Sequence, residues 1–408
     1  MKIGIVVQRY GLQINGGAEL HARLLAEKLS KNHQVSIFTT KAISYINWDN
    51  DIKPDYEQIN EIDVYRFRSH KKNKKLTHKY YRRLRNFSKI PIFLRKLGLH
   101  TIANSRFFYL KKNFFKWLKY QGPYCPEMLE KIKKVKNEYD IFIFFTYLYY
   151  PTNAILPIVK EKSLFIPTAH DEKPFYFPAY QEAFLNSKFI MYNSIGEKEL
   201  VIQTYPNIKK IQSDIAGVGF EQPIFEIKDR PFDNNYFVYI GRVDTSKNIH
   251  ELVKFFENYN KINPKTKLII IGKKEFNIKS QNKNIIFTGF ISEQEKNNLL
   301  YHSKALIIPS KHESLSMVTL EAMLMGKPVI AYYYSEVLVD HIKKSNAGFI
   351  YTDNHDFNNI LKHIEKMNNE QYNELSKNGK QYVLNNYTWD TIINKFENAF
   401  DYIKNQTN

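Results

Sequence analysis

The sequence of 408 residues contains one cysteine, Cys125, so neither an internal disulfide nor a cysteine-based metal site can form. A single thiol is typical of proteins from a reducing compartment. No stretch reaches the ~18 consecutive apolar residues that a membrane-spanning helix needs. The apolar run after Met1 is also too short for the core of a signal peptide. We therefore expect a cytoplasmic protein without a transmembrane anchor.

Acidic residues are absent from one long segment. Between Val64 and Pro126 there are 18 Lys and Arg and no Asp or Glu, which accounts for nearly all of the formal net charge of +19. The basic character of the protein therefore belongs to this segment, and an anionic partner should meet the chain there.

Short β-branched runs alternate with helical stretches, a pattern typical of α/β proteins with parallel sheets. The chain is too long for one ordinary core, so two doubly wound units are expected, joined near residues 216–234. Ligands of such sheets bind beyond the carboxyl ends of the strands, and two facing units would enclose a cleft. The predicted strands are 2–7, 34–40, 62–67, 139–146, 163–169 and 188–194, then 235–241, 267–272, 284–289, 304–310, 328–332 and 348–351. The predicted helices are about 17–30, 247–259, 292–302 and 316–326.

Three loops at predicted strand ends carry residues suited to a phosphorylated ligand. Gly16 and Gly17 let a backbone approach an anion at a helix N-terminus, or they form an ordinary flexible turn. Arg242 and Lys247 can both point at one diphosphate, or they belong to a solvated loop. His170 follows a strand at the edge where chemistry would occur, or it is a structural histidine.

The segment HESLSMVTLEAMLMGKP (312–328) places Glu313 before a predicted helix and Glu321 within it. Ser316 is the expected N-cap, and Gly326 with Pro328 should end the helix. A helix turns ~100° per residue, so each carboxylate must find its own partner. Sugar hydroxyls suit them as hydrogen-bond donors, while backbone N–H groups at the helix start suit a phosphate. Alternatively, Glu313 complements the helix dipole and Glu321 forms a surface ion pair.

These pieces together resemble a retaining glycosyltransferase of family four with the GT-B fold, of the type that builds bacterial surface polysaccharide or lipopolysaccharide. The matching pieces are NGGAE (15–19), HD (170–171), SIGEKEL (194–200), GRVDTSKN (241–248), FTGFIS (287–292), HESLSMVTLEAMLMGKPVIA (312–331) and YTWD (387–390). The resemblance implies two facing Rossmann-like domains with parallel sheets and an interdomain cleft. Residues 1–216 would bind the acceptor, and residues 217–387 would bind the nucleotide sugar. A helix of about 388–408 would pack back on the first domain.

The resemblance also implies roles for single residues. Arg242 and Lys247 would bind the nucleotide diphosphate, and Gly16 and Gly17 would close over the phosphates and the sugar. Glu313 would hold hydroxyls of the donor sugar, and Glu321 would bind the ribose. The remaining expected site residues are Phe290 at the base, His170 near the 6-position of the sugar, and Ser314, Leu315 and Ser316 where the family often has Gly-Phe-Gly. No cofactor is expected, and a divalent metal ion need not be involved. The role of Asp171 stays open.

The basic insert of about 68–130 interleaves aromatic and aliphatic residues with Lys and Arg. Such a segment suits an anionic membrane surface, with Trp117 or Phe114 entering the interface. We expect residues 68–120 to hold the enzyme on the inner face of the cell membrane, near a saccharide or lipid-linked acceptor. The alternative is a solvated loop with a partly buried aromatic face.

Other functions remain open at this point. A nucleic-acid-binding protein would use the same basic and aromatic residues, although no nucleic-acid-binding motif accompanies them, so no nucleic-acid partner is expected. Other GT-B enzymes, such as an epimerase or a phosphorylase, and an inactive homologue are further alternatives. The transferred sugar, the nucleotide, the acceptor and the oligomeric state cannot be predicted from these residues.

Overall fold

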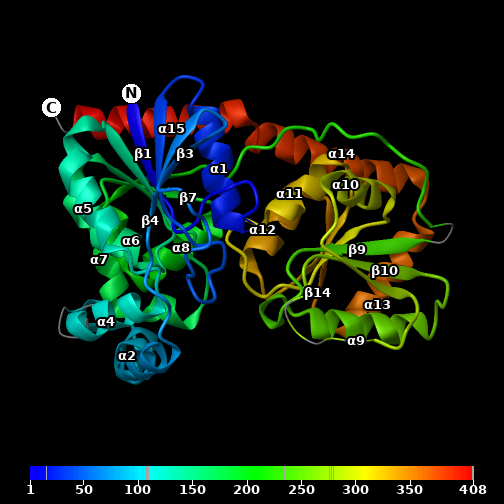
Figure 1. Cartoon of the computed structure of the whole chain (residues 1–408). Coiled ribbons are helices and arrows are strands. Elements are labelled where there is room, and N and C mark those ends of the chain that lie inside the picture. The colour runs from blue at the N-terminus through cyan, green and yellow to red at the C-terminus, as the bar shows by residue number, and fades with distance from the viewer. Residues whose placement is uncertain are drawn as a thin grey trace. The chain divides into compact units, whose positions relative to one another are not determined.

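The computed structural model describes residues 1–14, 16–103, 105, 110–232, 235–274, 276, 278 and 280–406, without the side chains of 100 and 101. Asn15 of the glycine loop, residues 104 and 106–109 of the basic insert, residues 233, 234, 275, 277 and 279, and the last two residues lie outside this description. The chain divides into two compact units (Figure 1). Unit 1 comprises Met1–Val218 with Ile392–Asn408, and unit 2 comprises Gly219–Thr391.

Unit 1 is built on an eight-stranded sheet with the order β3-β4-β2-β1-β5-β6-β7-β8. All neighbours pair in parallel except β3 with β4, which is an antiparallel pair. The strands are β1 (Lys2–Val6), β2 (Gln34–Thr40), β3 (Tyr56–Ile59), β4 (Ile62–Phe67), β5 (Ile141–Phe145), β6 (Ser163–Ile166), β7 (Phe189–Tyr192) and β8 (Gln212–Ile215). The central strand β5 reads IFIFF and is buried at every position, as expected for a parallel strand covered on both faces.

The helices of unit 1 cover this sheet and form its basic insert. They are α1 (Gly17–Leu29), α2 (Lys74–Lys96), α3 (His100–Ala103), α4 (Lys111–Gln121), α5 (Pro126–Val135), α6 (Tyr150–Ile155), α7 (Gln181–Leu185), α8 (Ile195–Thr204) and most of α15 (Trp389–Asn405). Figure 1 shows α2 and α4 side by side, and the two helices are in contact. The insert is therefore largely helical rather than an extended loop.

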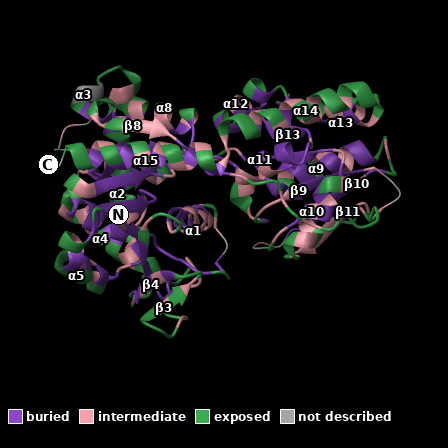
Figure 2. Cartoon of the chain, turned by 90° about the horizontal axis from the view of Figure 1, so that it is seen from above, coloured by how far each residue is buried: buried purple, intermediate pink, exposed green. Residues whose placement is uncertain are grey.

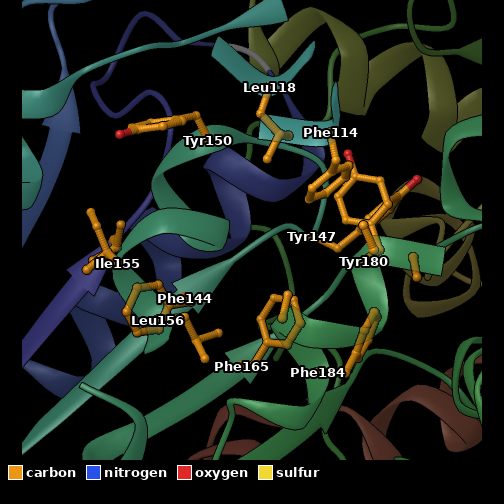
Figure 3. Close-up of a cluster of buried hydrophobic side chains, with 14 of the residues drawn as sticks. Phe114, Leu118, Phe144, Tyr147, Tyr150, Ile155, Leu156, Phe165, Tyr180 and Phe184 are labelled. Carbon is orange, nitrogen blue, oxygen red and sulfur yellow. The ribbon is translucent and has the colours of Figure 1, made fainter. Parts of the chain in front are cut away.

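The aromatic residues of α4 correct one expectation. Phe114 and Trp117 are each only 2 % exposed and belong to the core of unit 1, so they cannot enter a membrane interface in this structure. The Phe114 ring meets the Tyr180 ring edge to face, with centroids 4.7 Å apart (Figure 3). Burial of these large rings is more favourable in free energy than their exposure to water. The rings therefore hold α4 against the rest of unit 1.

Unit 2 contains a six-stranded, fully parallel sheet with the order β11-β10-β9-β12-β13-β14. Its strands are β9 (Tyr236–Ile240), β10 (Lys267–Ile271), β11 (Ile285–Gly289), β12 (Leu306–Ile308), β13 (Val329–Tyr332) and β14 (Gly348–Tyr351). Its helices are α9 (Ile249–Asn260), α10 (Glu293–His302), α11 (Met317–Leu324), α12 (Glu336–Ser345), α13 (Asn354–Lys366) and α14 (Asn369–Asn386).

Local sequence signals explain where several helices of unit 2 begin. Ser292 and Glu295 form a capping box at the start of α10, and Asn368 with Gln371 does the same for α14. Helices α9 and α13 lie together on one side of the sheet, and α11 and α14 lie together on the other (Figure 1). The central strands of each sheet are buried, as the purple centres of both units show (Figure 2).

Candidate functional site

The carboxyl edge of the unit 2 sheet gathers most of the predicted donor residues. Strands β9 and β12 are parallel neighbours, so the loops that follow them leave the same edge. Arg242 and Lys247 lie in the loop after β9, while Glu313 lies in the loop after β12. Topology alone therefore brings these two segments together.

Lys247 and Glu313 form an ion pair across these two loops. The distance from Lys247 Nζ to Glu313 Oε1 is 2.6 Å, and the side chains are 21 % and 14 % exposed. The backbone of Lys247 is fixed as well, because its N–H donates to Asp244 Oδ1 at 3.1 Å. This pair places one cation and one anion, both accessible, at the same strand edge.

Arg242 occupies the same loop but pairs with a different carboxylate. Its Nη1 lies 3.3 Å from Asp244 Oδ2, and its side chain is 45 % exposed. The hydroxyl of Tyr239 donates to the carbonyl of Arg242 and so fixes its backbone. The structure thus places Arg242 and Lys247 in one loop, each beside a carboxylate.

The start of α11 lies beside Glu313. Ser316 occupies the N-cap position as expected, in the left-handed region with φ 59°. Its hydroxyl lies 2.9 Å from the Thr319 hydroxyl instead of accepting from a backbone N–H. The first N–H groups of α11 therefore have no side-chain cap from Ser316, and Ser314 and Leu315 hold the loop just before them.

The residue that anchors this loop was not predicted from the sequence. His341 of α12 is 1 % exposed, and its Nε2 lies 2.8 Å from the carbonyl oxygen of Leu315. Its Nδ1 lies 2.9 Å from the Tyr382 hydroxyl. Because a carbonyl only accepts, Nε2 carries the proton and Nδ1 accepts from Tyr382. Burial lowers the pKa of His341, which favours this neutral form.

Glu321 does not share the partner of Glu313. It lies 3.2 Å from Lys296 of α10, which also contacts Glu293 at 2.6 Å. Burial raises the pKa of Glu321, although Lys296 opposes the change. The sequence analysis did not single out Lys296, because a lysine on a polar helix gives no local signal of a partner far along the chain.

Phe290, the residue predicted at the base, follows β11, and its side chain is 72 % exposed.

The glycine loop of unit 1 surrounds a buried ion pair. Arg9 Nη2 lies 2.6 Å from Glu19 Oε1, and Gln8 donates to the same oxygen at 2.9 Å. A Cβ at Gly16 would overlap the Glu19 carboxylate, so packing requires glycine there, whereas a Cβ at Gly17 would meet nothing within 4 Å. Of the predicted pair, only Gly16 is therefore required by its surroundings.

His170 lies at the carboxyl edge of the unit 1 sheet, beyond β6. Its Nε2 is 3.7 Å from Glu172 Oε1, an oxygen that also accepts from the buried Tyr147 hydroxyl. Asp171 points elsewhere and accepts from the Tyr176 hydroxyl at 2.9 Å. The neighbour of His170 is thus Glu172, which sequence reasoning did not single out.

A buried carboxylate supports the backbone next to His170. Glu197 is 1 % exposed and accepts from the N–H of Ala169 at 2.5 Å and from that of Asn193 at 2.6 Å. Burial raises its pKa to about 8 despite these two donors. The Ser-x-x-Glu spacing of Ser194 and Glu197 was a visible signal, because it is the pattern of a capping box.

Among the described residues, one group has the geometry to hold a metal ion. Asp353, His355 and Asp356 lie at the start of α13, but the two carboxylates already accept from nearby backbone N–H groups. These residues are not among those predicted for the donor site. Metal-independent chemistry remains a prediction.

Comparison with known proteins shows what the chain is similar to. Residues 220–382 match the family model for glycosyl transferases group 1. The chain is 22 % identical over 435 residues to an uncharacterized glycosyltransferase of Methanocaldococcus jannaschii, with 98 % of each chain covered. It is 27 % identical to the capsular polysaccharide biosynthesis glycosyltransferase CapM of Staphylococcus aureus, over 53 % of this chain and 59 % of that one.

Solved structures agree in fold. A sucrose-phosphate synthase from Thermosynechococcus elongatus has a TM-score of 0.68 at 16 % identity, with 98 % of both chains covered. The Anabaena protein HepE, solved with UDP and glucose, has a TM-score of 0.66 at 14 % identity, with 98 % of this chain and 99 % of that one covered. The α/β fold with two mainly parallel sheets is confirmed, and its structural neighbours are GT-B glycosyltransferases. The family match and the full-length relative together support glycosyltransferase group 1 activity.

Proposed function

We propose that this protein transfers a sugar from a nucleotide-diphosphate-sugar donor to a saccharide or glycolipid acceptor with retention of anomeric configuration. We assign it to the synthesis of cell-surface polysaccharide or lipopolysaccharide. The observation that carries the proposal is the meeting of Lys247, Glu313 and the start of α11 at one strand edge, with Arg242 in the same loop as Lys247.

When a donor binds, the ion pair between Lys247 and Glu313 would open, and each side chain would contact a different part of the donor. The ammonium would meet a diphosphate oxygen, and the carboxylate would accept from hydroxyls of the sugar. Negative charge grows on the diphosphate as its bond to the sugar breaks. Arg242, Lys247 and the N–H groups of α11 would stabilise that charge without rearranging.

Retention follows if attack and departure occur on one face of the sugar. The leaving diphosphate oxygen would then accept the proton of the attacking acceptor hydroxyl. No side chain of the protein needs to form a covalent intermediate in this scheme, and no metal or cofactor is required by it. The site residues act by binding, orienting and stabilising charge.

Calorimetry with UDP-glucose, GDP-mannose and ADP-glucose tests the donor assignment. We expect one of these nucleotide sugars to bind, and Arg242→Ala or Lys247→Ala to lower turnover by about two orders of magnitude or more. Lys254→Ala, which removes an exposed cation of α9, is the matched control. Transfer at wild-type rates in both site variants would refute the assignment, and the anomeric form of the product, read by NMR, tests retention.

We also propose that α2 docks the protein on an anionic membrane surface. One stripe of α2 lines a hollow of about 350 Å³ with Lys75, His78, Lys79, Arg82, Arg83 and Asn86. A second hollow of about 510 Å³ continues the stripe past Ile90 to Leu110 and Asn113. Exposed apolar side chains follow on the same segment, with Ile90 52 %, Phe93 60 % and Leu97 58 % exposed.

This arrangement of charged and apolar side chains along α2 favours a membrane surface over a nucleic acid as the partner. Lysine and arginine would meet lipid phosphates, while aliphatic side chains would enter the interface. Two of the three exposed apolar side chains, Ile90 and Leu97, offer no flat ring on which a base could stack, and only Phe93 of this set does. None of the described helices combines the length and hydropathy needed to cross a bilayer.

A further inference from the structure

Two adjacent tyrosines project from the carboxyl edge of the unit 2 sheet. Tyr333 and Tyr334 form the turn between β13 and α12, and they are 39 % and 55 % exposed. Their ring centroids are 4.0 Å apart with an interplanar angle of 40°. Together they make an accessible aromatic surface that the proposed donor site does not use.

The backbone beneath these rings is held on both sides. The N–H of Tyr333 donates to the carbonyl of Tyr351 on β14, and the N–H of Ser335 donates to the carbonyl of Tyr332. The buried Tyr332 ring stacks on the Tyr351 ring at 5.0 Å in the core of unit 2. The backbone that carries the exposed pair is therefore fixed before any ligand arrives, which reduces the entropy lost on binding.

A lysine borders the aromatic pair. Lys311, in the loop after β12, places its ammonium 5.7 Å from the ring centroids of both Tyr332 and Tyr334. An aromatic surface beside a hydrogen-bond donor suits a ligand with one apolar face and polar groups at its edge.

The order of the strands indicates which ligand this is. In the proposed function, Phe290 after β11 meets the base, Arg242 and Lys247 after β9 meet the diphosphate, and Glu313 after β12 meets the sugar. Strand β13 is the next neighbour of β12, on the side away from β9. The tyrosine pair therefore lies at the sugar end of this series.

We infer that Tyr333 and Tyr334 form a binding surface for a pyranose ring, which stacks through its C–H face while a hydroxyl accepts from the Lys311 ammonium. The placement rests on the proposed function. The ring belongs either to the donor sugar or to a saccharide of the acceptor, since both present the same chemistry. In either case this surface contributes to the choice of sugar.

Saturation-transfer NMR and calorimetry can test the surface with a double variant, Tyr333→Ala with Tyr334→Ala. The probes are UDP, UDP-glucose, GDP and GDP-mannose, and the methyl glycosides of glucose, galactose, mannose and N-acetylglucosamine. Tyr333→Phe with Tyr334→Phe keeps both rings and should bind as the wild type does. Tyr301→Ala is the matched control, because Tyr301 is 38 % exposed and lies on α10 of the same unit.

The two sources of the ring give different results. If the donor sugar stacks here, the alanine variant binds the nucleotide sugar about tenfold more weakly and the free nucleotide equally well. If an acceptor saccharide stacks here, binding of the methyl glycosides falls by a similar factor while the nucleotide sugar is unaffected.

Three results would overturn the inference. The first is equal binding of all probes by the wild type and the alanine variant, and the second is an equal loss in Tyr301→Ala. The third is a wild-type protein that contacts no saccharide at all. Loss of glycoside binding in the alanine variant of a protein that binds no nucleotide would refute the donor assignment and leave the tyrosine surface in place.

Discussion

His341 acts on the donor loop through one backbone carbonyl. Its Nε2–H donates to Leu315, two residues after Glu313 and two residues before α11 begins. Tyr382 of α14 in turn fixes the imidazole by donating to Nδ1. Precise placement of binding groups depends on such supporting contacts, because small displacements of a loop weaken several interactions at once.

Replacing His341 should separate donor binding from stability. His341→Gln can still donate to the Leu315 carbonyl, whereas His341→Phe keeps a ring and loses both hydrogen bonds. We expect the Phe variant to raise KM for the nucleotide sugar about tenfold and the Gln variant to restore most of the loss.

Tyr372→Phe provides the control for this comparison. It removes a tyrosine hydroxyl that donates to the carbonyl of Lys304 elsewhere in unit 2. Tyr382→Phe, by contrast, removes the hydroxyl that fixes His341. Equal KM values for Tyr372→Phe and Tyr382→Phe, at equal melting temperatures, would show that the Tyr382 hydroxyl is not needed to position the loop. A wild-type KM in His341→Phe would show that the imidazole does not position it.

Glu197 makes stability depend on pH in a definite direction. Its pKa rises from an ordinary value of 4.5 to about 8 in the folded protein, because burial disfavours the carboxylate. Between these two values the folded state binds more protons than the unfolded state, so the free energy of unfolding falls as pH rises. The slope is at most about 1.4 kcal/mol per pH unit, and the penalty is complete above pH 8.

Glu197→Gln should remove this slope, because the amide does not titrate. Urea unfolding from pH 5 to pH 8 measures it, with Glu199→Gln as the control on an exposed position of the same helix. The wild type and Glu199→Gln should lose stability across this range relative to Glu197→Gln. Parallel curves for all three proteins would contradict the assignment of a raised pKa.

The candidate site shows which residue features the sequence could predict. Glu313 and Lys247 stood out because charged residues at the ends of buried strands must lie near one edge of the sheet. Their direct pairing, and the pairing of Glu321 with Lys296, could not be predicted, because these contacts depend on how loops and helices pack. His341 had no local signal at all, since one buried histidine looks like any other in a sequence.

At the scale of elements, buried strands were the most predictable. Strands such as β5 and β10 are continuous apolar runs, and the predicted ranges contain them. Strands β3 and β8 were missed because YEQI and QSDI are mostly polar and only partly buried. The helix α2 was hidden by its charge, although Tyr80, Leu84, Ser88 and Pro91 line its buried side at helical spacing.

The exposed side of α2 should govern binding to anionic vesicles. Lys79→Gln, Arg82→Gln and Arg83→Gln together remove three charges, and we expect binding to vesicles with anionic lipid to fall about tenfold or more at low salt. The control removes three exposed lysines of α5, namely Lys131, Lys133 and Lys134. Sedimentation with neutral and anionic vesicles measures the difference.

A second set of substitutions tests the apolar side chains of α2. Phe93→Ser with Leu97→Ser keeps every charge and should weaken binding that survives at higher salt, because apolar burial is not screened. Equal binding of all variants to neutral and anionic vesicles would refute docking through α2. Displacement of the vesicles by an oligonucleotide would instead support the nucleic-acid alternative.

At the scale of the whole molecule, the chain completes unit 1 with its last helix. Residues Ile392, Phe396 and Phe400 of α15 are fully buried, and Glu397 pairs with His33 at 2.6 Å. Lys395 donates to the carbonyl of Ile215 at 2.5 Å, and all of these partners lie in unit 1. Unit 1 therefore needs residues from both ends of the chain, whereas unit 2 is continuous.

This connectivity predicts which unit responds to a core mutation in α15. Phe400→Ala should destabilise unit 1 by about 3–5 kcal/mol, because it removes a fully buried ring. Phe357→Ala is the matched change, since Phe357 is equally buried in unit 2.

Two-unit proteins need not unfold in one step, so hydrogen exchange followed by mass spectrometry should report each unit separately. Phe400→Ala should speed exchange in β1, β2 and β7 and leave β9, β10 and β13 protected, with the reverse for Phe357→Ala. Faster exchange in both sheets of the Phe400→Ala protein would mean that the two units unfold together and that α15 does not serve unit 1 alone.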